Sequence, residues 1–303
     1  MQDESPVVSV IIPAYKSEHT LNRCLATVLA QDFESFEIIL CASADDEGDL
    51  PALDPSPRMV VLTSVPRLSA AQARNRAVAE ARGELLVFTD ADVVASKGWL
   101  SALVAGSRDG TRSVAGAVAN GTPESAVGTA EYLVQFLDLH PARPARTAWH
   151  GATCNLLVPR NLWDRFGPFP EDMKGGEDTL LTTELRAAGS FVFHPGAVVT
   201  HLNRTDLTTA LRHQFQFGLF TAILGRRADL KFGTLTRYPV LAPVALGGRI
   251  VSLYGRVLAW APKLLLRSIS LAPLIVALLS AWSVGLAMGG LRRWTRVGRL
   301  DMP

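Results

Sequence analysis

Two aspartates, Asp90 and Asp92, follow an apolar run from Leu85 to Thr89. The unbroken run predicts a central parallel strand that is buried on both faces, and the ligands of such sheets bind beyond the carboxyl ends of the strands. The spacing of two places both carboxylates on one side of an extended backbone, where they repel each other unless a cation lies between them. The pattern therefore predicts a Mg²⁺ or Mn²⁺ site that shares the phosphates of a substrate; the alternative is a solvated turn after a strand.

A second pair of carboxylates, Glu177 and Asp178, follows two glycines at 175–176 and precedes Leu181 and Leu185, which lie one helical turn apart. This pattern predicts a helix that begins near Glu177. The dipole at a helix N-terminus favours the ionised form of a carboxylate, so Asp178 is expected to accept a proton near neutral pH. Asp178 is a candidate general base, and simple capping of the helix is the alternative.

Strands and helices alternate in the part of the chain that must position these residues. The apolar patterns predict strands over residues 7–12, 36–41, 58–62 and 85–89, and helices over residues 17–31 and 69–82. Gly83 is expected to cap the second of these helices at its C-terminus. The β-α-β order predicts an α/β fold with a doubly wound, mostly parallel sheet and right-handed crossovers.

The middle of the chain is less regular. Residues 101–112 predict a short helix and a loop, and residues 113–118 predict a strand. Residues 120–150 contain three prolines and are expected to form, over part of their length, a mobile loop at the edge of a cleft. Arg143 and Arg146 in this segment are expected on the solvated surface, and contact with a phosphate or a lipid head group is the alternative.

The composition limits the classes of protein. A net charge of +2 over 303 residues is too small to indicate nucleic-acid binding. The three cysteines form neither a metal pattern nor a disulfide framework, which fits a reducing compartment. The polar, acidic residues 1–6 predict no signal peptide. The mean hydropathy of +0.20 is high for a soluble enzyme, and the apolar excess lies towards the C-terminus.

Six motifs occur in the order that they have in one enzyme family. They are Val8–Tyr15, Ala73–Ala77, Thr89–Asp92, Gly151–Asn155, Phe166–Glu171 and Gly176–Leu181. Together they resemble glycosyltransferase family 2 over residues 6–205. The resemblance implies the GT-A fold, a Rossmann-like catalytic domain over residues 1–205. Its nucleotide-sugar-binding half covers about residues 6–110 and its acceptor-binding half about residues 111–205.

The resemblance also implies roles for individual residues. Asp178 matches the catalytic base, and Glu177 is expected to orient it. Asp92 is expected to bind the metal that bridges the donor diphosphate, and Asp90 to bind it through water or to reach the ribose. His201 either completes the metal site or only caps the end of a strand. The implied nucleotide contacts are Pro13, Tyr15, Ser43, Arg74 and Asp90, and the implied acceptor contacts are Gly151, Asn155 and Gly176.

One position departs from the family pattern. The family carries an aspartate after the second strand that pairs with the N3–H of uracil, and Ala42 stands at this position. The loss of a carboxylate that accepts a hydrogen bond from the base puts a uridine donor in doubt. Ser43 remains as a hydrogen-bonding side chain, and Asp45 or Asp46 could reach the base from one turn later.

The C-terminal part predicts attachment to a membrane. Residues 206–237 are expected to form a linking helix, and residues 238–303 to form membrane-associated helices with a basic tail. The uncharged run from Ser268 to Leu291 corresponds to about 36 Å of helix, enough to span a bilayer. Residues 238–262 carry Arg249 and Arg256 seven positions apart, with Lys263 a further seven along. That spacing suits an amphipathic helix on anionic lipid, although a hairpin of two membrane helices would keep the basic tail inside.

These patterns predict a metal-dependent, inverting glycosyltransferase with a nucleotide-sugar donor and a lipid-linked or membrane-proximal acceptor. The chain lacks the Gln-x-x-Arg-Trp motif of processive synthases, which favours transfer of a single sugar. The catalytic domain is expected to face the cytosol at the cytoplasmic membrane. One alternative is a nucleotidyltransferase, although residues 13–17 do not form its Gly-rich basic loop. The other is a non-catalytic nucleotide-sugar-binding scaffold, against which the intact aspartates at 90, 92 and 178 argue.

Overall fold

The computed structural model describes residues 5–148, 150–173, 175–227 and 238–291. They form two compact units, each assembled from separate stretches of chain. The first unit comprises Met1–Gly121, Leu139–Phe169 and Glu177–Leu202. The second comprises Thr122–Asp138, Pro170–Gly176 and Asn203–Pro303. The division differs from a simple boundary near residue 205, because two internal segments belong with the C-terminal helices.

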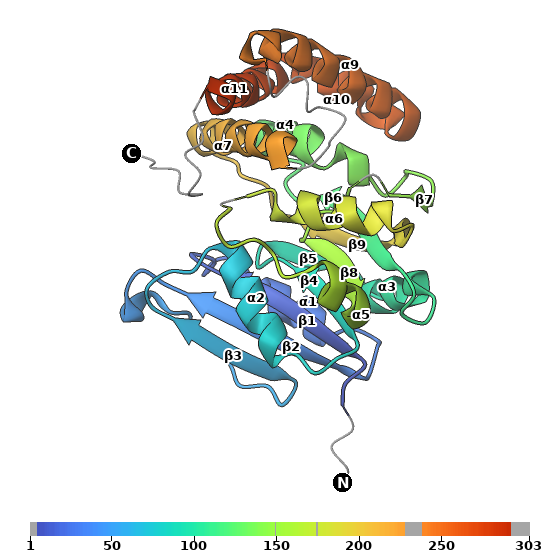
Figure 1. Cartoon of the computed structure of the whole chain (residues 1–303). Coiled ribbons are helices and arrows are strands. Elements are labelled where there is room, and N and C mark those ends of the chain that lie inside the picture. Colours follow the sequence, from blue (N-terminus) through green and yellow to red (C-terminus); the bar gives the residue numbers. More distant parts are fainter. Residues whose placement is uncertain (1–4, 149, 174, 228–237, 292–303) are drawn as a thin grey trace. The chain divides into compact units, whose positions relative to one another are not determined.

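A mixed sheet is the centre of the first unit (Figure 1). Its spatial order is β3-β2-β1-β4-β8-β6-β9-β5, with β7 paired to β9. The strands are β1 (Val8–Ala14), β2 (Phe36–Ser43), β3 (Met59–Ser64), β4 (Leu85–Thr89), β5 (Val93–Ala95), β6 (Ser113–Asn120), β7 (Arg146–Thr147), β8 (Asn155–Pro159) and β9 (Phe191–His201).

The two halves of this sheet are paired differently. Strands β1 to β4 pair in parallel, as the β-α-β order predicts. Beyond β4 the sheet adds β8 and β5 in antiparallel pairings, and only β6 and β9 run parallel there. The α/β fold class is confirmed, and most of the paired residues of this mixed sheet are in parallel registers. Helix-linked parallel pairing thus places the carboxyl ends of β1, β2 and β4 on one edge.

The first unit contains helices α1 (Leu21–Leu29), α2 (Ala70–Glu80), α3 (Trp99–Ser107), α5 (Arg160–Phe166) and α6 (Glu177–Ala187), with a short 3-10 turn, η1 (Glu47–Asp49). Ser69 caps α2 as predicted, in a capping box with Gln72. Gly83 does not cap this helix. Its amide donates to Ser9 Oγ at 2.8 Å, and a Cβ at residue 83 would lie 2.6 Å from the Ser9 backbone nitrogen. Glycine is therefore required there by the close approach of β1.

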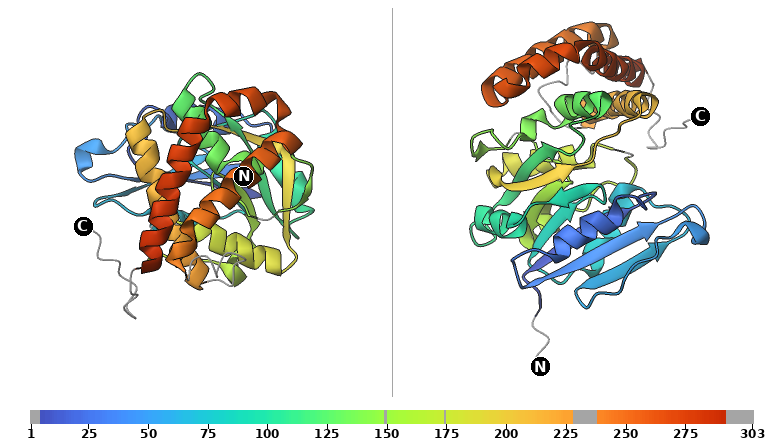
Figure 2. Two further views of the ribbon diagram at one scale, coloured as in Figure 1. Left: turned by 90° about the horizontal axis from the view of Figure 1, so that it is seen from above. Right: turned by 180° about the vertical axis from the view of Figure 1, so that it is seen from behind.

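The second unit is helical. It contains α4 (Ala126–Gln135), α7 (Leu207–Arg227), α9 (Ala242–Trp260), α10 (Leu265–Ser270) and α11 (Ala272–Leu291), with the 3-10 turns η3 (Pro239–Leu241) and η4 (Pro262–Leu264). A further turn, η2 (Leu137–Leu139), follows α4. Within this unit α9, α10 and α11 form a layer on α4 and α7, in the same arrangement in both side views (Figures 1 and 2).

Residues 120–150 differ from the loop that the prolines predict. A Ser125-capped helix, α4, occupies ten of them, and it is buried on nearly all sides. Arg143 does not lie on the solvated surface: it is 3% exposed and its guanidinium lies 4.7 Å from the centre of the Phe193 ring. The backbone of Arg146 pairs with Phe193 in β9. The segment is therefore built into the fold.

Helices α7 and α11 pack at close range through glycine. A Cβ at Gly218 would lie 2.0 Å from the Trp282 carbonyl oxygen, and one at Gly285 would lie 2.0 Å from the Phe215 carbonyl oxygen. Trp282 Nε1 also donates to Thr221 Oγ1 at 3.2 Å. Small residues that let two helix backbones approach are typical of helix pairs in apolar surroundings.

In the described part of the chain, α11 is the one helix that is long and apolar enough to span a bilayer, and 44% of its apolar window is buried against the protein. The arginines of α9 do not line a lipid-facing side. Arg249 stacks 4.4 Å from the Trp282 ring and donates to the Val134 carbonyl oxygen at 3.2 Å, and Arg256 pairs with Asp138. The expected arginine face toward lipid is wrong, because this face points at α4 and α11. The basic tail and residues 228–237 of the linking segment lie outside the described residues.

Candidate active site

Asp90 and Asp92 stand where β4 ends and the chain turns into β5. The residues between the two strands form a turn, not the extended backbone that the spacing suggested. The two carboxylates consequently meet different partners. Asp90 Oδ1 accepts a hydrogen bond from Arg74 Nη2 at 2.7 Å, whereas Asp92 Oδ1 lies 3.5 Å from His201 Nε2.

Arg74 ties the carboxylates of two distant motifs together. Helix α2 presents this side chain, which is 4% exposed, at the end of the sheet. Its Nη2 pairs with Asp90, and its Nη1 pairs with Glu177 Oε1 at 2.9 Å. Burial of a guanidinium is tolerated because both of its ion pairs are short hydrogen bonds. Arg74 thus joins the end of β4 to the start of α6, and its contact with the nucleotide stays a prediction.

Glu177 and Asp178 begin α6, as the two glycines predict, and Gly176 precedes them with φ of +81°. Burial raises the pKa of both carboxyls above their usual values, and the charge of Arg74 opposes the shift. The direction is opposite to the effect expected from the helix dipole, so loss of solvation outweighs that dipole. A carboxylate with a raised pKa is a stronger base, and the role of Asp178 as the general base stays a prediction.

The orientation of Asp178 is fixed by its neighbours in the first unit. Its Oδ1 accepts a hydrogen bond from the Thr179 amide at 2.7 Å and a longer one from Thr179 Oγ1 at 3.3 Å. A backbone hydrogen bond from Thr153 also lowers its pKa against the effect of burial. Thr153 belongs to the motif at 151–155, so that motif supports the candidate base.

Asp92 and His201 are brought together by the pairing of β5 with β9. Val93 lies opposite His201 in the antiparallel register, and the Leu202 amide donates to the Asp92 carbonyl at 2.9 Å. One carboxylate and one imidazole are a donor set that Mn²⁺ accepts, and diphosphate oxygens would complete its shell. Within the described residues no group of three histidine, cysteine or acidic side chains converges on one point. The pair therefore fits a metal that is shared with a substrate.

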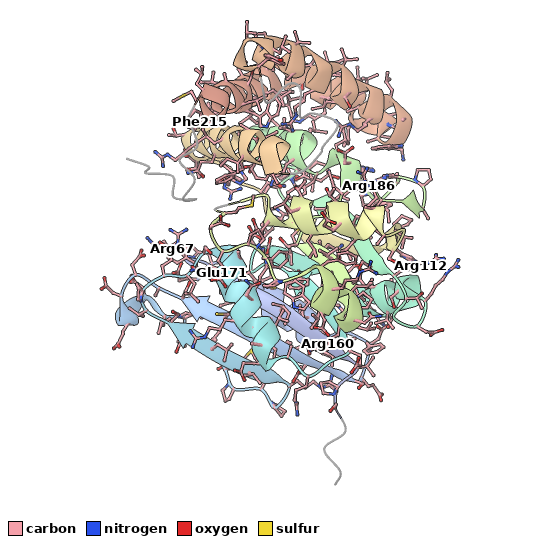
Figure 3. All side chains as sticks on the ribbon, viewed as in Figure 1. Arg67, Arg112, Arg160, Glu171, Arg186 and Phe215 are labelled. Atoms are coloured by element: carbon pink, nitrogen blue, oxygen red, sulfur yellow. The ribbon has the colours of Figure 1, made fainter. Side chains whose placement is uncertain are left out.

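A second polar cluster lies at the ends of β1, β2 and β3. The Tyr15 hydroxyl donates to Asp45 Oδ2 at 2.8 Å, and Lys16 Nζ lies 3.1 Å from the same oxygen. The Arg67 guanidinium lies 3.9 Å from the centre of the Tyr15 ring. Figure 3 labels Arg67 on the ribbon. The hydrogen bond from Tyr15 and the charge of Lys16 hold the pKa of Asp45 below its usual value.

This cluster also shows what the sequence motifs missed. Ala42 and Ser43 are buried at the end of β2, and Pro13 pairs with Cys41 in β1 and β2. Asp45, one of the two alternatives raised by the sequence, is exposed three residues after Ala42 and contacts Tyr15 and Lys16. Lys16 and Arg67 were not anticipated. Lys16 follows the end of β1, and Arg67 follows the end of β3. Because parallel strands end at a common edge of the sheet, these positions could have identified both residues as site candidates.

The expected acceptor residues are structural in two cases. Asn155 is completely buried: its Nδ2 donates to the carbonyls of Ala117 and Ala197, and its Oδ1 accepts from Trp99 Nε1. The Asn155 amide is thus occupied by hydrogen bonds within the first unit, and its acceptor role stays a prediction. Gly151 is buried as well.

The need for glycine at position 151 comes from packing: a Cβ at Gly151 would lie 2.9 Å from the Phe191 ring. The acceptor role of Gly176, a residue of the second unit, stays a prediction. The three cysteines are buried and free.

Comparison with known proteins supports the same interpretation. The sequence matches the profile of Glycosyl transferase family 2 over residues 9–154. Glycosyltransferase AglE of Haloferax volcanii is 25% identical over 229 residues, which are 72% of this chain and 74% of AglE. The Escherichia coli UDP-Glc:alpha-D-GlcNAc-diphosphoundecaprenol beta-1,3-glucosyltransferase WfgD is 36% identical over 90 residues, but these are only 28% of this chain and 35% of WfgD.

A solved structure shares the fold. The mannosyltransferase PcManGT from Pyrobaculum calidifontis, in complex with GDP-Man and Mn²⁺, superposes with a TM-score of 0.59 at 20% identity. The similarity covers 93% of this chain and 87% of PcManGT. The profile over residues 9–154 and the glycosyltransferase relatives support membership of glycosyltransferase family 2 and a glycosyltransferase activity. The shared fold is that of the GT-A glycosyltransferases.

Proposed function

We propose that the chain is a metal-dependent, inverting transferase that moves one sugar from a nucleoside diphosphate to a lipid-linked or membrane-proximal acceptor. The observation that carries this proposal is the convergence in one unit of Asp92 with His201 and of Arg74 with Asp90 and Glu177, next to Asp178. These residues come from three separate motifs, and a fold without catalysis has no need to bury so many charges together.

The donor end of the site is the pair of Asp92 and His201. These two side chains would hold Mg²⁺ or Mn²⁺ together with the diphosphate. When bound, the metal would neutralise the charge that develops on the departing β-phosphate. Asp90 is turned towards Arg74 by its hydrogen bond, so we assign it a positioning role and not direct coordination.

Asp178 is the proposed base. In a single displacement the acceptor oxygen forms a bond to the anomeric carbon as the bond from that carbon to the β-phosphate oxygen breaks. Asp178 takes the proton of the acceptor hydroxyl, and the electron pair leaves with the nucleoside diphosphate. Attack opposite to the leaving group inverts the anomeric configuration. Thr179 and Thr153 hold the carboxylate, while Arg74 and Glu177 set its electrostatic surroundings.

Asp45 is proposed to read the nucleotide base in place of the carboxylate that Ala42 lacks. Its Oδ2 is held by Tyr15 and Lys16, but a carboxylate has about four acceptor positions, which leaves room for an N–H of the base. Arg67 supplies further donors beside the Tyr15 ring. The Asp45 carboxylate would accept hydrogen bonds from N–H groups of the nucleotide base, and the neighbouring cations would donate to its carbonyl or ring-nitrogen acceptors.

The acceptor class is supported by the relatives and by the C-terminal helices. WfgD carries an undecaprenyl diphosphate substrate in its name, and α11 meets the length and composition of a membrane helix. Nucleotide sugars are cytosolic, so the proposed enzyme works at the cytoplasmic membrane with its catalytic unit facing the cytosol. The absence of a Gln-x-x-Arg-Trp motif supports transfer of a single sugar.

The test is donor binding followed by donor cleavage. The full chain in detergent or nanodiscs is titrated with UDP, GDP, dTDP and CDP, with and without Mn²⁺, beside Asp92→Ala and Asp178→Asn. The proposal expects one nucleotide to bind in a metal-dependent way. Asp92→Ala abolishes that binding, whereas Asp178→Asn keeps it and loses release of nucleoside diphosphate from the sugar donor. Folded protein that binds none of the four nucleotides would overturn the proposal.

A further inference from the structure

The outward face of α9 carries no charged side chain. From Pro243 to Pro262 its exposed positions are filled by proline, valine, glycine, alanine and leucine, with Ser252 as the one hydroxyl among them. Val244, Val251 and Leu258 are strongly exposed and follow each other at intervals of seven, so they lie on one side of the helix. A helix whose outer side faces water normally carries its charges there.

The charges of α9 lie on the opposite side and fasten the helix to the second unit. Arg249 is five residues after Val244, which places it about 140° away around the helix axis. Its guanidinium contacts the Trp282 ring and the Val134 carbonyl, and Arg256 pairs with Asp138. The amphipathic character of α9 is therefore inverted: its cations bind the protein, and its apolar residues point away from it.

The apolar face continues over the next two helices. Leu266 and Ile269 of α10 are 81% and 54% exposed, and Val284 and Leu291 of α11 are 53% and 73% exposed. Exposed apolar side chains on three successive helices of one unit indicate an interaction site. These residues, with those of α9, are called the outer face of α9–α11.

The charge pattern indicates what binds to the outer face of α9–α11. The sequence from residue 230 to residue 300 contains no aspartate or glutamate but ten lysines and arginines. The exposed Lys263 and Arg267 flank the apolar residues of α9 and α10. Apolar side chains bordered by cations, with no acidic residue, fit the surface of an anionic bilayer, whose head groups attract the cations while its acyl chains receive the apolar residues.

The packing of α11 decides between spanning the bilayer and lying in its surface. At Gly218 and Gly285 the backbones of α7 and α11 are in contact, and Trp282 bonds to Thr221. If α11 crossed the membrane in this packing, it would draw α7 into the hydrocarbon. Between its contact residues Phe215 and Gly218, α7 carries the exposed Gln216, and the exposed Arg212 lies one turn before Phe215. Polar groups of this kind are costly in a bilayer core.

We propose that the outer face of α9–α11 attaches the protein to anionic membranes in the plane of one leaflet, without crossing it. The proposal names the surface that would bring the enzyme to the membrane-proximal acceptor of the proposed function. It does not depend on catalysis, and its test measures vesicle binding instead of sugar transfer. The two proposals can therefore fail separately.

Binding to vesicles is the first measurement. The full chain is floated with liposomes of phosphatidylglycerol and phosphatidylcholine, or of phosphatidylcholine alone. Binding is expected to the anionic vesicles and to fall by about tenfold or more in the double variant Val251→Asp/Leu258→Asp. The matched control is Val60→Asp, an exposed valine of β3 in the first unit, which leaves binding unchanged.

Depth of insertion is the second measurement. Single cysteines that replace Val244 and Leu258, and in a separate pair Val276 and Leu291, carry a fluorophore whose quenching by brominated lipids reports depth. The native cysteines are buried and do not compete for the label. Each pair is separated by about 21 Å along its helix. In-plane attachment expects equal depths within each pair.

Three results would overturn the proposal. Unequal depths at residues 276 and 291 would indicate a spanning α11. Failure of the wild type to bind anionic vesicles would remove the membrane as the occupant. A mass of two chains in solution that returns to one chain in the Val251→Asp/Leu258→Asp variant, without vesicle binding, would assign the face to a second copy of the protein.

Discussion

The charge balance around Asp178 depends on a single side chain. Arg74 is the cation that lies between Asp90 and Glu177, and it acts against the burial that raises the pKa of Asp178. Without its two carboxylate partners, the buried Arg74 guanidinium would destabilise the fold strongly. Without the guanidinium, the pKa values of the buried carboxyls would rise further. Arg74 is thus a positioning residue for the proposed base.

This role predicts a shift of the pH–rate profile. The base form of Asp178 is lost as pH falls through its pKa in the folded protein, which lies above the usual value. Replacing Arg74 by Gln removes a charge that lowers this pKa, so the acid limb of the profile is expected to move to higher pH. The measurement is release of nucleoside diphosphate from the donor as a function of pH.

Arg76→Gln is the control for Arg74→Gln, because Arg76 is an exposed arginine on the same helix. Its acid limb should coincide with that of the wild type. The loss of a buried cation should also lower the free energy of unfolding by about 3 kcal/mol in Arg74→Gln. An acid limb that stays in place in a folded Arg74→Gln protein would contradict the assigned role.

Asp45 offers a second test at the residue scale. Replacing Asp45 by Ala is expected to weaken donor binding about tenfold, the size of one lost hydrogen bond to a charged group, with little effect on cleavage of bound donor. Asp49→Ala, an exposed aspartate of the same loop, serves as the control. Equal binding by wild type and Asp45→Ala would exclude Asp45 from base recognition. Isothermal titration calorimetry with the nucleotide identified by the binding experiment gives the dissociation constants of the wild type and of Asp45→Ala.

Site residues within short sequence motifs could be predicted. Residues whose contacts come from distant parts of the chain could not. The placement of Asp92 with His201 and of Asp178 at a helix start follows from local pattern and pairing. The hydrogen bonds of Asn155 could not be predicted in this way, because its amide is satisfied by two carbonyls and an indole from three different elements. No local spacing shows such partners.

At the scale of the elements, the glycine contacts of α7 and α11 are the most sensitive feature of the second unit. Gly285→Ala forces a methyl group against the Phe215 carbonyl, so the two helices must separate. We expect a loss of about 2–3 kcal/mol in the free energy of unfolding, since overpacking of a tight contact costs this much. Thermal unfolding followed by circular dichroism in detergent measures it.

Gly247→Ala provides the matched control for this prediction. Gly247 lies in α9 with nothing within 4 Å of an added Cβ. Its replacement should stabilise the helix by about 0.5–1 kcal/mol, because alanine has the higher helix propensity. If both variants changed stability by the same amount and in the same direction, the contact of the helix backbones would not be the cause.

Prediction of elements succeeded where hydrophobic periodicity was clear. The strand Leu85–Thr89 and the start of α6 at Glu177 lie where the patterns placed them. Helix α4 was missed because residues 128–134 are all buried, so no polar side marks the helical period. The arginines of α9 marked one face correctly, but a spacing of seven does not indicate whether that face meets lipid or protein.

At the scale of the whole chain, the two units are interleaved in sequence. Segments 122–138 and 170–176 lie within the predicted catalytic domain but belong to the helical unit. Sequence motifs indicate candidate catalytic residues. They do not show which segments of the chain pack against each other. Cutting the chain at residue 205 would therefore leave α4 without α7 and α11.

A chain of residues 1–205 is predicted to fold poorly. Glu131 in α4 is 1% exposed and is held by Arg204 and by His213, and the second of these would be missing. The exposed apolar sides of α4 should cause aggregation and strong binding of a hydrophobic dye. A chain that ends at Leu291 keeps every helix described and is the control. Soluble, cooperatively melting protein from residues 1–205 would show that the first unit is independent of the second.

Interleaving has a further consequence during synthesis. Helix α4 leaves the ribosome early, but α11, against which it packs, is complete only after Leu291, roughly 150 residues later. At ~5–20 residues per second this delay is roughly 10–30 s. For that time the nascent chain carries α4 without α11, and for about the first half of it Glu131 also lacks Arg204 and His213. The yield of folded protein in a cell should therefore depend on chaperones that bind nascent chains.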